Sequence, residues 1–253
     1  MKFVAIIPAR FASTRFPGKP LADMNGKPMI QRVYEQVTKS VADAYIATDD
    51  ERIYKAVESF GGNVVMTSSL HPSGTDRCKE AYNKIEESYD VVLNIQGDEP
   101  FILPKQIDLL KACFVDSEIE IATLVKPFDP KDGIDVLRNP SSPKVVISEN
   151  YEAIYFSRSI IPFLRDIDQK DWMNHHVFYK HIGIYGYRTD VLNRITQLPI
   201  GSLEKAESLE QLRWIENGFK IKVGVTSYET FGIDTPEDLK IALMNMDENS
   251  DKD

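Results

Sequence analysis

The first thirty residues, MKFVAIIPAR FASTRFPGKP LADMNGKPMI, contain the pattern that decides the fold of this chain. Residues 3–8 are a continuous apolar run, which is typical of a parallel strand buried on both faces. Residues 9–26 are polar, contain glycine and proline, and predict a loop. From about residue 28 to residue 40, apolar side chains recur at helical spacing and predict a helix. The order of strand, loop and helix predicts the first unit of an α/β fold.

The same alternation of strands and helices continues to about residue 126. Further strands are predicted at residues 44–47, 63–67, 90–96 and 119–126, and helices between them end near residues 60, 88 and 116. Parallel strands need long crossover connections, and helices of this length supply them. The sequence therefore predicts an α/β fold with a mainly parallel sheet flanked by helices.

The second half of the chain follows a different pattern. Its strands are predicted at residues 145–148, 153–157, 179–187 and 219–225, and one helix at residues 203–218. The first two of these strands are short and close together, which indicates an antiparallel hairpin. The segment Thr235-Pro-Glu-Asp, with a cap residue and a proline at the first helical position, starts a last helix.

No stretch of the sequence has the composition of an interdomain linker. We therefore expect a single domain over residues 1–247. Within it, residues from about 128 to 190 would form an antiparallel excursion. The last seven residues, 247–253, are acidic and polar and predict a disordered tail.

The composition limits the class of partner. The chain has 253 residues with 30 Lys and Arg against 39 Asp and Glu, a net charge of −9. Such an acidic balance disfavours nucleic acid and membrane surfaces as partners. We see no secretory signal and no run of the roughly 20 apolar residues needed to span a bilayer. The two cysteines, Cys78 and Cys113, do not form a CxxC pair. We expect a cytoplasmic protein.

The loop after the first strand carries cations without carboxylates. Arg10, Arg15 and Lys19 lie within the first 19 residues, which contain no Asp or Glu. Ligands of open α/β folds bind beyond the carboxyl ends of the strands, so this loop is suited to a polyphosphate. The glycine patterns of P-loop NTPases and of dinucleotide-binding folds are absent from the sequence, which disfavours those classes. A solvated basic surface loop would have the same composition, and the residues alone leave that alternative open.

Two aspartates stand where they could share a metal ion. Asp98 follows the strand predicted at residues 90–96, and Asp234 stands immediately before the last helix. Magnesium in proteins is usually held by one or two carboxylates together with phosphates of the substrate. From placement alone we predict that both aspartates bind magnesium. Each could instead be a turn residue or favour a helix N-terminus by its charge.

Seven segments resemble, in order and spacing, the bacterial CMP-Kdo synthetases, or 3-deoxy-manno-octulosonate cytidylyltransferases. They are IIPARFASTRFPGKPLADMNGKPMI at 6–30, HPSGTDR at 71–77, NIQGDEP at 94–100, YFSR at 155–158, HIGIYGYR at 181–188, LEQLRW at 209–214 and GIDTPEDL at 232–239. The resemblance implies the nucleotide-diphospho-sugar transferase fold, which is Rossmann-like. It also implies that the excursion at about residues 128–190 contains the region that binds the sugar and forms a homodimer. It implies that CTP and Kdo react to CMP-Kdo and pyrophosphate, for lipopolysaccharide biosynthesis.

The resemblance also implies a role for each matching residue. The CTP-binding residues would be Ala9, Arg10, Arg15, Lys19, Ser73, Gly74 and Asp98. The sugar-binding residues would be Gln96, Arg158, His181, Tyr185, Glu210 and Gln211. Asp98 and Asp234 would bind Mg²⁺, and with the three cations of the first loop they would be catalytic. Asp76 departs from the family pattern, in which Glu is common, and the roles of Asp76 and Arg77 stay open.

Without the resemblance, the sugar-binding residues have structural alternatives. His181 and Tyr185 lie in an aromatic strand and could belong to the core. Arg158 could pair with a structural acid, and Glu210 and Gln211 could border the core. The acceptor could be Kdo or an amino-substituted analogue. The alternative classes are another sugar nucleotidyltransferase, such as a CMP-sialic acid synthetase or a hexose-phosphate pyrophosphorylase, a non-catalytic nucleotide-binding protein and an NAD-dependent dehydrogenase.

Overall fold

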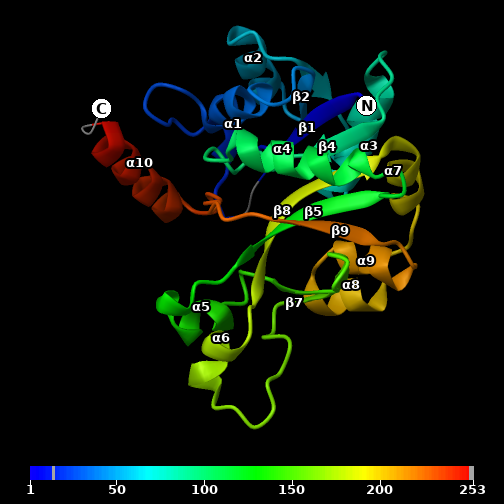
Figure 1. Cartoon of the computed structure of the whole chain (residues 1–253). Helices are drawn as coiled ribbons and strands as arrows, with labels where there is room; N and C mark the ends of the chain where they lie inside the picture. The colour runs from blue at the N-terminus through cyan, green and yellow to red at the C-terminus, as the bar shows by residue number, and fades with distance from the viewer. Residues whose placement is uncertain (13–14, 251–253) are drawn as a thin grey trace. The chain divides into compact units, whose positions relative to one another are not determined.

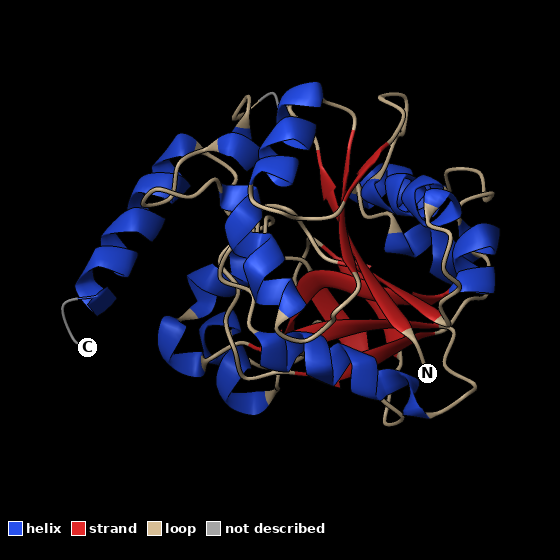
Figure 2. Cartoon of the chain, turned by 90° about the horizontal axis from the view of Figure 1, so that it is seen from above, coloured by secondary structure: helices blue, strands red, loops and turns tan. Residues whose placement is uncertain are grey.

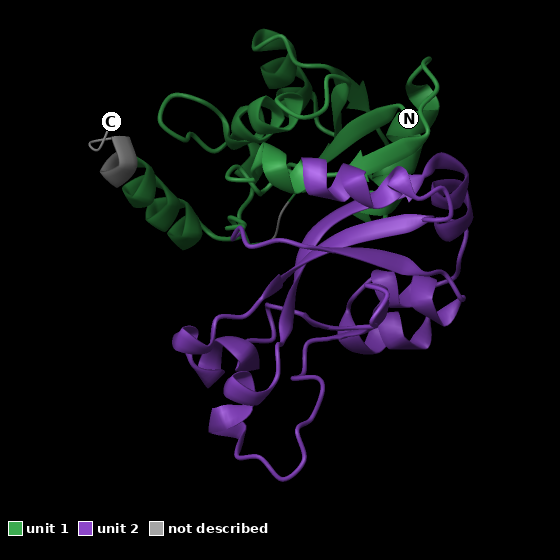
Figure 3. Cartoon of the chain, viewed as in Figure 1, with its two compact units in different colours: residues 1–107, 230–253 green, residues 108–229 purple. Residues whose placement is uncertain are grey.

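The computed structural model (Figure 1) describes residues 1–12 and 15–250, without the side chains of residues 247–250. Its strands are flanked by helices (Figure 2), which confirms the predicted α/β class. The chain divides into two compact units (Figure 3), residues 1–107 with 230–253 and residues 108–229. One boundary falls inside a helix, α4 (Pro104–Ala112), where no linker composition could mark it. That the chain is one domain over residues 1–247 stays a prediction.

The first unit is built on parallel strands in the order β3-β2-β1-β4. Their bounds are Phe3–Ala9 for β1, Ala44–Thr48 for β2, Val64–Met66 for β3 and Val91–Asn94 for β4. The centre of β1 is fully buried, from Val4 to Ile7, because a parallel strand is covered on both faces. These pairings confirm the parallel sheet predicted from the first half of the sequence.

The helices of the first unit begin where the sequence offers capping residues. They are α1 (Met29–Thr38), α2 (Glu51–Ser59), α3 (Gly74–Lys84) and α10 (Pro236–Ser250), with a 3₁₀ turn, η1, at Lys19–Leu21. The side chains of Asp50 and Ser73 accept hydrogen bonds from backbone N–H groups in the first turns of α2 and α3. Such caps satisfy donors that have no partner within the helix.

The last helix extends farther than the sequence predicted. We expected a disordered tail at residues 247–253, but the helical backbone of α10 continues to Ser250. The prediction is therefore wrong for residues 247–250, and residues 251–253 lie outside the described part of the chain. Earlier in the helix, Ala242 packs with Ile233, Met24 and Met29 in a buried cluster. Once packing has nucleated a helix, each further residue adds a hydrogen bond, so the helix can continue into polar sequence.

The second unit is a mixed sheet centred on β5 (Ile121–Pro127). This strand pairs antiparallel with β8 (Tyr179–Arg188) and parallel with β9 (Ile221–Val225). The hairpin of β6 (Lys144–Ile147) and β7 (Ala153–Ser157) is antiparallel, as predicted, and β6 also pairs with β8. The sequence pattern suggested that β5 continues the parallel series. Its antiparallel partner is distant in the sequence, and local alternation cannot reveal such a partner.

Short helices complete the second unit. They are α5 (Ile134–Arg138), α6 (Trp172–His175), α7 (Thr189–Ile195), α8 (Ser202–Glu207) and α9 (Gln211–Glu216), with 3₁₀ turns η2 (Cys113–Val115), η3 (Pro130–Asp132) and η4 (Gln169–Asp171). Within residues 1–12 and 15–250, no helix of either unit has both the length and the apolar character that a membrane span requires.

The helix predicted at residues 203–218 is in fact two helices, α8 and α9. Ser208 separates them with a left-handed backbone, at a φ of 52°. Arg158 donates hydrogen bonds from its guanidinium to the carbonyl oxygens of Glu207 and Ser208. These carbonyls lie at the end of α8, where the helix itself provides no donors. A side chain about fifty residues away in the sequence therefore stabilises the break.

Candidate functional site

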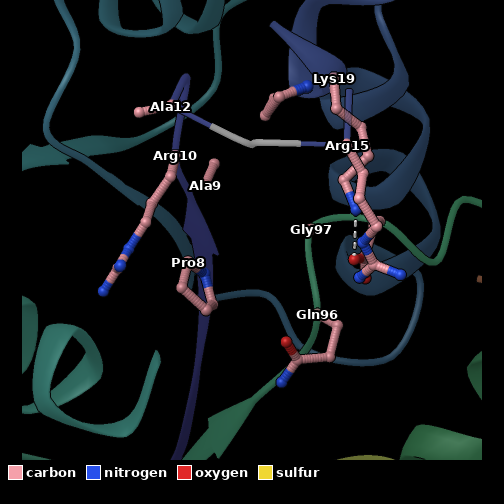
Figure 4. Close-up of a pocket in the computed structure, with 10 residues that line it drawn as sticks. Pro8, Ala9, Arg10, Ala12, Arg15, Lys19, Gln96 and Gly97 are labelled. Atoms are coloured by element: carbon pink, nitrogen blue, oxygen red, sulfur yellow. Dashed lines mark hydrogen bonds and ion pairs between the residues drawn. The ribbon is translucent and has the colours of Figure 1, made fainter. Parts of the chain in front are cut away.

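A cavity of about 340 Å³ lies at the carboxyl end of β1 (Figure 4). It is lined by Pro8, Ala9, Arg10, Ala12, Arg15, Lys19, Pro20, Gln96, Gly97 and Asp98. Since β1 and β4 are neighbouring parallel strands, the loops that follow them meet at the same edge of the sheet. The structure therefore brings the cationic loop to Gln96 and Asp98, as the sequence pattern indicated.

Lys19 is the central cation of this site. Its Nζ lies 2.7 Å from Oδ2 of Asp98 and 3.2 Å from Oδ1 of Asp234. Nη1 of Arg15 lies 3.1 Å from the other carboxylate oxygen of Asp234. The Lys19 side chain is 13% exposed, whereas that of Arg15 is 65% exposed. The two predicted metal ligands therefore share the partly buried charge of Lys19, while Arg15 extends into solvent.

The turn before Lys19 depends on Gly18. Its φ of 73° lies in the left-handed region, and a Cβ at this position would lie 3.1 Å from the ring of Phe11. The Gly18 N–H donates to the carbonyl oxygen of Phe11 at 3.0 Å, which closes the loop. Glycine thus permits the turn that directs the Lys19 side chain to the aspartates.

Gly97 is required by a close approach of two backbone segments. A Cβ at Gly97 would lie 2.7 Å from the carbonyl oxygen of Pro8, closer than van der Waals contact allows. Glycine therefore lets the loop after β4 pass directly beside the end of β1, with Asp98 as its next residue. The sequence alone suggests for Gly97 only a turn formed with Asp98. The Gly-Asp pair at the end of a strand was the signal that could have identified it.

Backbone hydrogen bonds hold the segments of Asp98 and Asp234 together. The N–H of Ile233 donates to the carbonyl oxygen of Asp98 at 2.9 Å. The Asp238 carboxylate accepts from the N–H groups of Asp234 and Thr235 at 3.0 and 2.9 Å. Burial raises the pKa of Asp238, but these hydrogen bonds outweigh it and hold that pKa below its ordinary value. Because Thr235 and Asp238 cap α10, the Asp234 carboxylate remains available to cations.

Arg10 lies apart from the Lys19 group. Its Nη2 donates to the carbonyl oxygen of His71, and its side chain is directed away from Lys19 (Figure 4). Burial, followed by repulsion from Arg77, lowers the pKa of Arg10 from its ordinary value. Since its bound partner is a neutral carbonyl, the positive charge of this guanidinium is available to an anionic ligand.

Ser73 and Gly74 begin α3 beside the end of β1. The Ser73 hydroxyl donates to Oδ2 of Asp76 at 2.6 Å and accepts from the N–H of Asp76 at 3.1 Å. A Cβ at Gly74 would lie 3.5 Å from Cγ of Pro8, an ordinary contact distance. The start of the helix therefore adjoins β1, and Asp76, whose role the sequence left open, completes the cap.

Arg77 is a buried structural residue. It is 0% exposed, and its guanidinium donates to Oγ1 of Thr67 at 2.5 Å and to Oδ2 of Asp49 at 2.9 Å. Asp49 follows β2 and Thr67 follows β3, so Arg77 fastens α3 to both strand ends. The structure thus gives Arg77 a stabilising role, outside the cavity lining.

In the second unit, His181 and Tyr185 belong to an aromatic cluster. The ring centroids of His181 and Tyr185 are 5.3 Å apart, and those of Tyr185 and Trp214 are 5.1 Å apart. Burial lowers the pKa of His181 to about 3. Burial, followed by the charge of Glu210, raises the pKa of Tyr185 well above its ordinary value. Both side chains are therefore neutral at physiological pH, and Glu210 lies near enough to influence one of them.

Gln211 carries a polar group that the described protein atoms leave unsatisfied. Its side chain is on α9 and only 4% exposed, and its Nε2 has no hydrogen-bond partner among the described residues. A buried donor without a partner costs about 1–3 kcal/mol. A ligand acceptor at this position would remove that cost. Another sugar-binding candidate, Gln96, lies in the first unit, in the lining of the cavity at β1.

Arg158 makes several contacts within the second unit. Its Nε, Nη1 and Nη2 donate to the carbonyl oxygens of Glu207, Pro140 and Ser208, at 2.7, 2.8 and 3.3 Å. Its backbone N–H donates to the Glu207 carboxylate at 2.9 Å. These contacts support a structural role for Arg158, although its guanidinium bonds to carbonyl oxygens and not to the acid that the alternative expected. A guanidinium has five N–H donors, however, so two remain beyond the three used for carbonyls.

Comparisons with known proteins agree with the resemblance found in the sequence. A cytidylyltransferase family model matches residues 4–221. A 3-deoxy-manno-octulosonate cytidylyltransferase of Parabacteroides distasonis is 66% identical over 244 residues, which are 96% of this chain and 97% of that protein. An 8-amino-3,8-dideoxy-manno-octulosonate cytidylyltransferase of a Shewanella strain is 46% identical over 245 residues, 95% of this chain and 96% of that protein.

A solved structure has the same fold over nearly the whole chain. It is that of a CMP:2-keto-3-deoxy-manno-octonic acid synthetase complexed with CTP, at 42% identity and a TM-score of 0.89. The match covers 98% of this chain and 100% of the other. Because the family model spans both compact units and these relatives align over almost every residue, the chain belongs to the cytidylyltransferase family.

Proposed function

We propose that this cytidylyltransferase joins CTP to 3-deoxy-manno-octulosonate (Kdo) and forms CMP-Kdo and pyrophosphate, a step of lipopolysaccharide biosynthesis. The observation that carries the proposal is the cavity at the end of β1, where Lys19 and Arg15 face Asp98 and Asp234. Nucleotidyl transfer needs cations for the triphosphate and carboxylates for a metal ion, and this site has both. The 66% identity to a relative named for Kdo supports this choice of acceptor.

The triphosphate of CTP binds to Arg10, Arg15 and Lys19. The ion pair between Arg15 and Asp234 is largely exposed to solvent, so it is weak and a polyphosphate can displace it. Ala9 lines the same cavity, and a Cβ added at Gly74 would lie in ordinary contact with Pro8, which also lines it. We assign the cytosine to Ala9, Ser73 and Gly74.

Asp98 and Asp234 are suited to hold Mg²⁺. The ammonium of Lys19 already lies within 2.7 and 3.2 Å of the two carboxylates, so this position accommodates positive charge. In the part of the chain that the structure describes, no three His, Cys, Asp or Glu side chains form a metal cage. Two carboxylates nevertheless fit Mg²⁺, which takes its remaining ligands from phosphates and water. Bound there, Mg²⁺ would neutralise phosphate charge and lower the pKa of the attacking hydroxyl.

Side chains of the second unit recognise the sugar. His181, Tyr185 and Gln211 offer neutral hydrogen-bonding groups, and Gln211 has a buried donor ready for a ligand acceptor. The N–H donors of Arg158 that do not bind carbonyls can hold the sugar's carboxylate. We assign Glu210 to the same sugar, and the assignment of Gln96 as a sugar contact rests on the resemblance alone.

In the reaction, the anomeric hydroxyl of Kdo attacks the α-phosphorus of CTP. A P–O bond to the sugar forms, the bond to the β-phosphate oxygen breaks, and the hydroxyl proton passes to solvent. Negative charge grows on the departing pyrophosphate. Arg10, Arg15 and Lys19 stabilise that charge because they bind the β- and γ-phosphates.

An 8-amino analogue of Kdo is the second candidate acceptor. A relative named for that sugar is 46% identical to this chain, whereas a relative named for Kdo is 66% identical, so Kdo is the first candidate. The two acceptors differ in one group, a hydroxyl against an amine. A competition between them in one reaction mixture therefore decides the substrate.

We place the enzyme in the cytoplasm as a homodimer. Support for a dimer comes from exposed apolar side chains within the predicted excursion. Ile154, Phe163 and Val177 are 55%, 77% and 54% exposed. Apolar groups in contact with water favour association with a second surface. Sedimentation analysis of the purified protein tests the dimer.

The function is tested by pyrophosphate release from purified protein with Mg²⁺, CTP and Kdo. ATP, GTP and UTP replace CTP in parallel reactions, and sialic acid or the 8-amino analogue replaces Kdo. We expect release only with CTP and Kdo, and CMP-Kdo as the second product. Release with the amino analogue but not with Kdo would show that the analogue is the acceptor and would leave the rest of the mechanism unchanged. No release with any pair would contradict the enzyme assignment and favour a nucleotide-binding protein.

A further inference from the structure

Thr123 occupies an irregular point in the sheet of the second unit. The register of β5 and β8 shifts between Thr123 and Leu124, so that residues 183–184 of β8 lie between successive partners. The Thr123 Oγ1 lies 2.8 Å from the carbonyl oxygen of Ile184 and 3.2 Å from that of Ile182. Thr123 is fully buried. Bulges of this kind redirect neighbouring side chains, and here a hydroxyl stabilises the bulge.

The same hydroxyl contacts the imidazole of His181. The distance between Oγ1 of Thr123 and Nε2 of His181 is 3.1 Å. A hydroxyl has one proton to donate and lone pairs to accept with. The Thr123 oxygen lies only 2.8 Å from the Ile184 carbonyl oxygen, which can only accept, so the Thr123 proton must lie between these two oxygens. The oxygen therefore accepts from the ring, and Nε2 of His181 carries the proton.

The other ring nitrogen is then an acceptor. Because burial lowers the pKa of His181 to about 3, the ring is neutral at physiological pH and Nδ1 carries a lone pair. The rings of Phe156 and Tyr185 pack against the imidazole, at centroid distances of 5.1 and 5.3 Å, and limit its rotation. The site thus holds the imidazole in one orientation.

We propose that Thr123 is a positioning residue that holds His181 in the neutral tautomer protonated at Nε2, so that Nδ1 accepts a hydrogen bond from a hydroxyl of the bound sugar. The proposal rests on the proposed function for the identity of the ligand. It gives His181 a definite part in specificity. A lone pair attracts the hydroxyl groups of a sugar acid and repels its carboxylate, which must bind elsewhere.

The neighbouring groups complement this polarity. The Tyr185 hydroxyl keeps its proton, since burial and the nearby charge of Glu210 raise its pKa. Gln211 contributes a buried amide donor. An acceptor at His181 among these donors suits a polyhydroxylated ligand, whose hydroxyl groups both donate and accept. A His181 protonated at Nδ1 instead would turn this acceptor into a further donor.

The tautomer can be observed directly by ¹⁵N–¹H correlation spectra of the imidazole groups in the full-length protein. The chain has four histidines, and the His181→Asn variant identifies the signal of His181 by its loss. We expect a neutral ring protonated at Nε2 between pH 6 and 8. A ring protonated at Nδ1, or an imidazolium at pH 7, would overturn the proposal without any variant of Thr123.

Three variants then test the part played by the hydroxyl. Thr123→Val removes it with little change in volume, and should shift the ring toward the Nδ1 tautomer and raise KM for the sugar about tenfold, with KM for CTP unchanged. Thr123→Ser retains the hydroxyl and should restore both properties. Thr196→Val is the control, because it removes a half-buried threonine hydroxyl that bonds within α7 of the same unit. An unchanged tautomer in folded Thr123→Val would contradict the proposal, and if that variant does not fold, the Thr123→Ser and wild-type spectra still decide.

The outcome separates this proposal from the proposed function. The tautomer is a property of the free protein and needs no substrate. If the spectra show the Nε2 tautomer but no acceptor sugar reacts, the enzyme assignment fails and the geometry stands. If CMP-Kdo forms and Thr123→Val raises the KM values of CTP and the sugar equally, the positioning role fails and the enzyme assignment stands.

Discussion

The Nζ of Lys19 lies 2.7 Å from Oδ2 of Asp98, and 3.2 Å from Oδ1 of Asp234. One ammonium thus bridges the two carboxylates to which we assign Mg²⁺. An ammonium and a divalent cation cannot occupy this position together. When a triphosphate attracts Lys19, the carboxylates become available to the metal ion. Binding of nucleotide and metal should therefore be coupled, each increasing the affinity for the other.

Removal of this ammonium should expose the metal site. We expect Lys19→Met to bind Mn²⁺ roughly tenfold more tightly than the wild type in the absence of nucleotide, because two adjacent carboxylates lose their counterion. Titration calorimetry with Mn²⁺ measures the difference. Lys27→Met, which removes an exposed lysine paired with Glu35, is the matched control and should leave Mn²⁺ affinity unchanged. Equal affinity of wild type and Lys19→Met would contradict the coupling.

Asp98→Asn should separate catalysis from stability. The variant keeps the size of the side chain but loses the charge needed for a metal ion, so we expect kcat to fall by about 100-fold or more. The melting temperature should change little, because Asp98 is partly exposed. Asp108→Asn, at a carboxylate 58% exposed on α4, controls for the substitution. A kcat within a factor of two of wild type would exclude Asp98 as a metal ligand.

Gly97→Ala tests the close approach beside β1. A methyl group 2.7 Å from the Pro8 carbonyl oxygen must displace one of the two backbone segments. We expect about 1–3 kcal/mol less stability and a higher KM for CTP. Denaturant unfolding and steady-state kinetics measure the two effects. Gly232→Ala is the control, since a Cβ there meets no atom within 4 Å. Equal stability of the two variants would show that the backbone adjusts freely.

Arg77→Met should destabilise the first unit without touching the cavity. It leaves the Asp49 carboxylate and the Thr67 hydroxyl without their buried donor, and we expect a loss of about 3 kcal/mol. Arg52→Met breaks an ion pair whose arginine is 61% exposed, and should reduce stability much less, because solvent screens such a pair. Urea unfolding of both variants measures the contrast. Similar losses of stability in the two variants would show that Arg77 contributes no more than a surface arginine does.

The largely desolvated His181 should make the protein less stable in acid. Its pKa is about 3 in the folded state, against an ordinary value of 6.5. Between these values the unfolded chain binds a proton that the folded protein does not, so stability falls as the pH decreases from about 6.5 toward 3. Above pH 6.5 the contribution is complete. His181→Gln should flatten this part of the curve of unfolding free energy against pH. An identical slope in the variant would show that His181 is accessible to protons when folded.

The sequence by itself determined the parallel strands of the first unit, the hairpin of β6 and β7, and the identity of the cationic loop. Each of these depends on local patterns, such as an apolar run, a capping residue or a short turn, which neighbouring residues express without help from the rest of the chain. The family resemblance added site residues, because whole segments were matched in order.

The tertiary structure alone decided how distant residues meet. Lys19 reaches Asp98 across 79 residues and Asp234 across 215, and Thr123 meets His181 across 58. The antiparallel partner of β5 and the break at Ser208 have the same origin, since β8 and Arg158 are remote in the sequence. Local propensity is weak, and a distant contact that satisfies buried polar groups outweighs it. For that reason the chain's pattern predicts which residues carry charge, and only the fold decides which charges are paired.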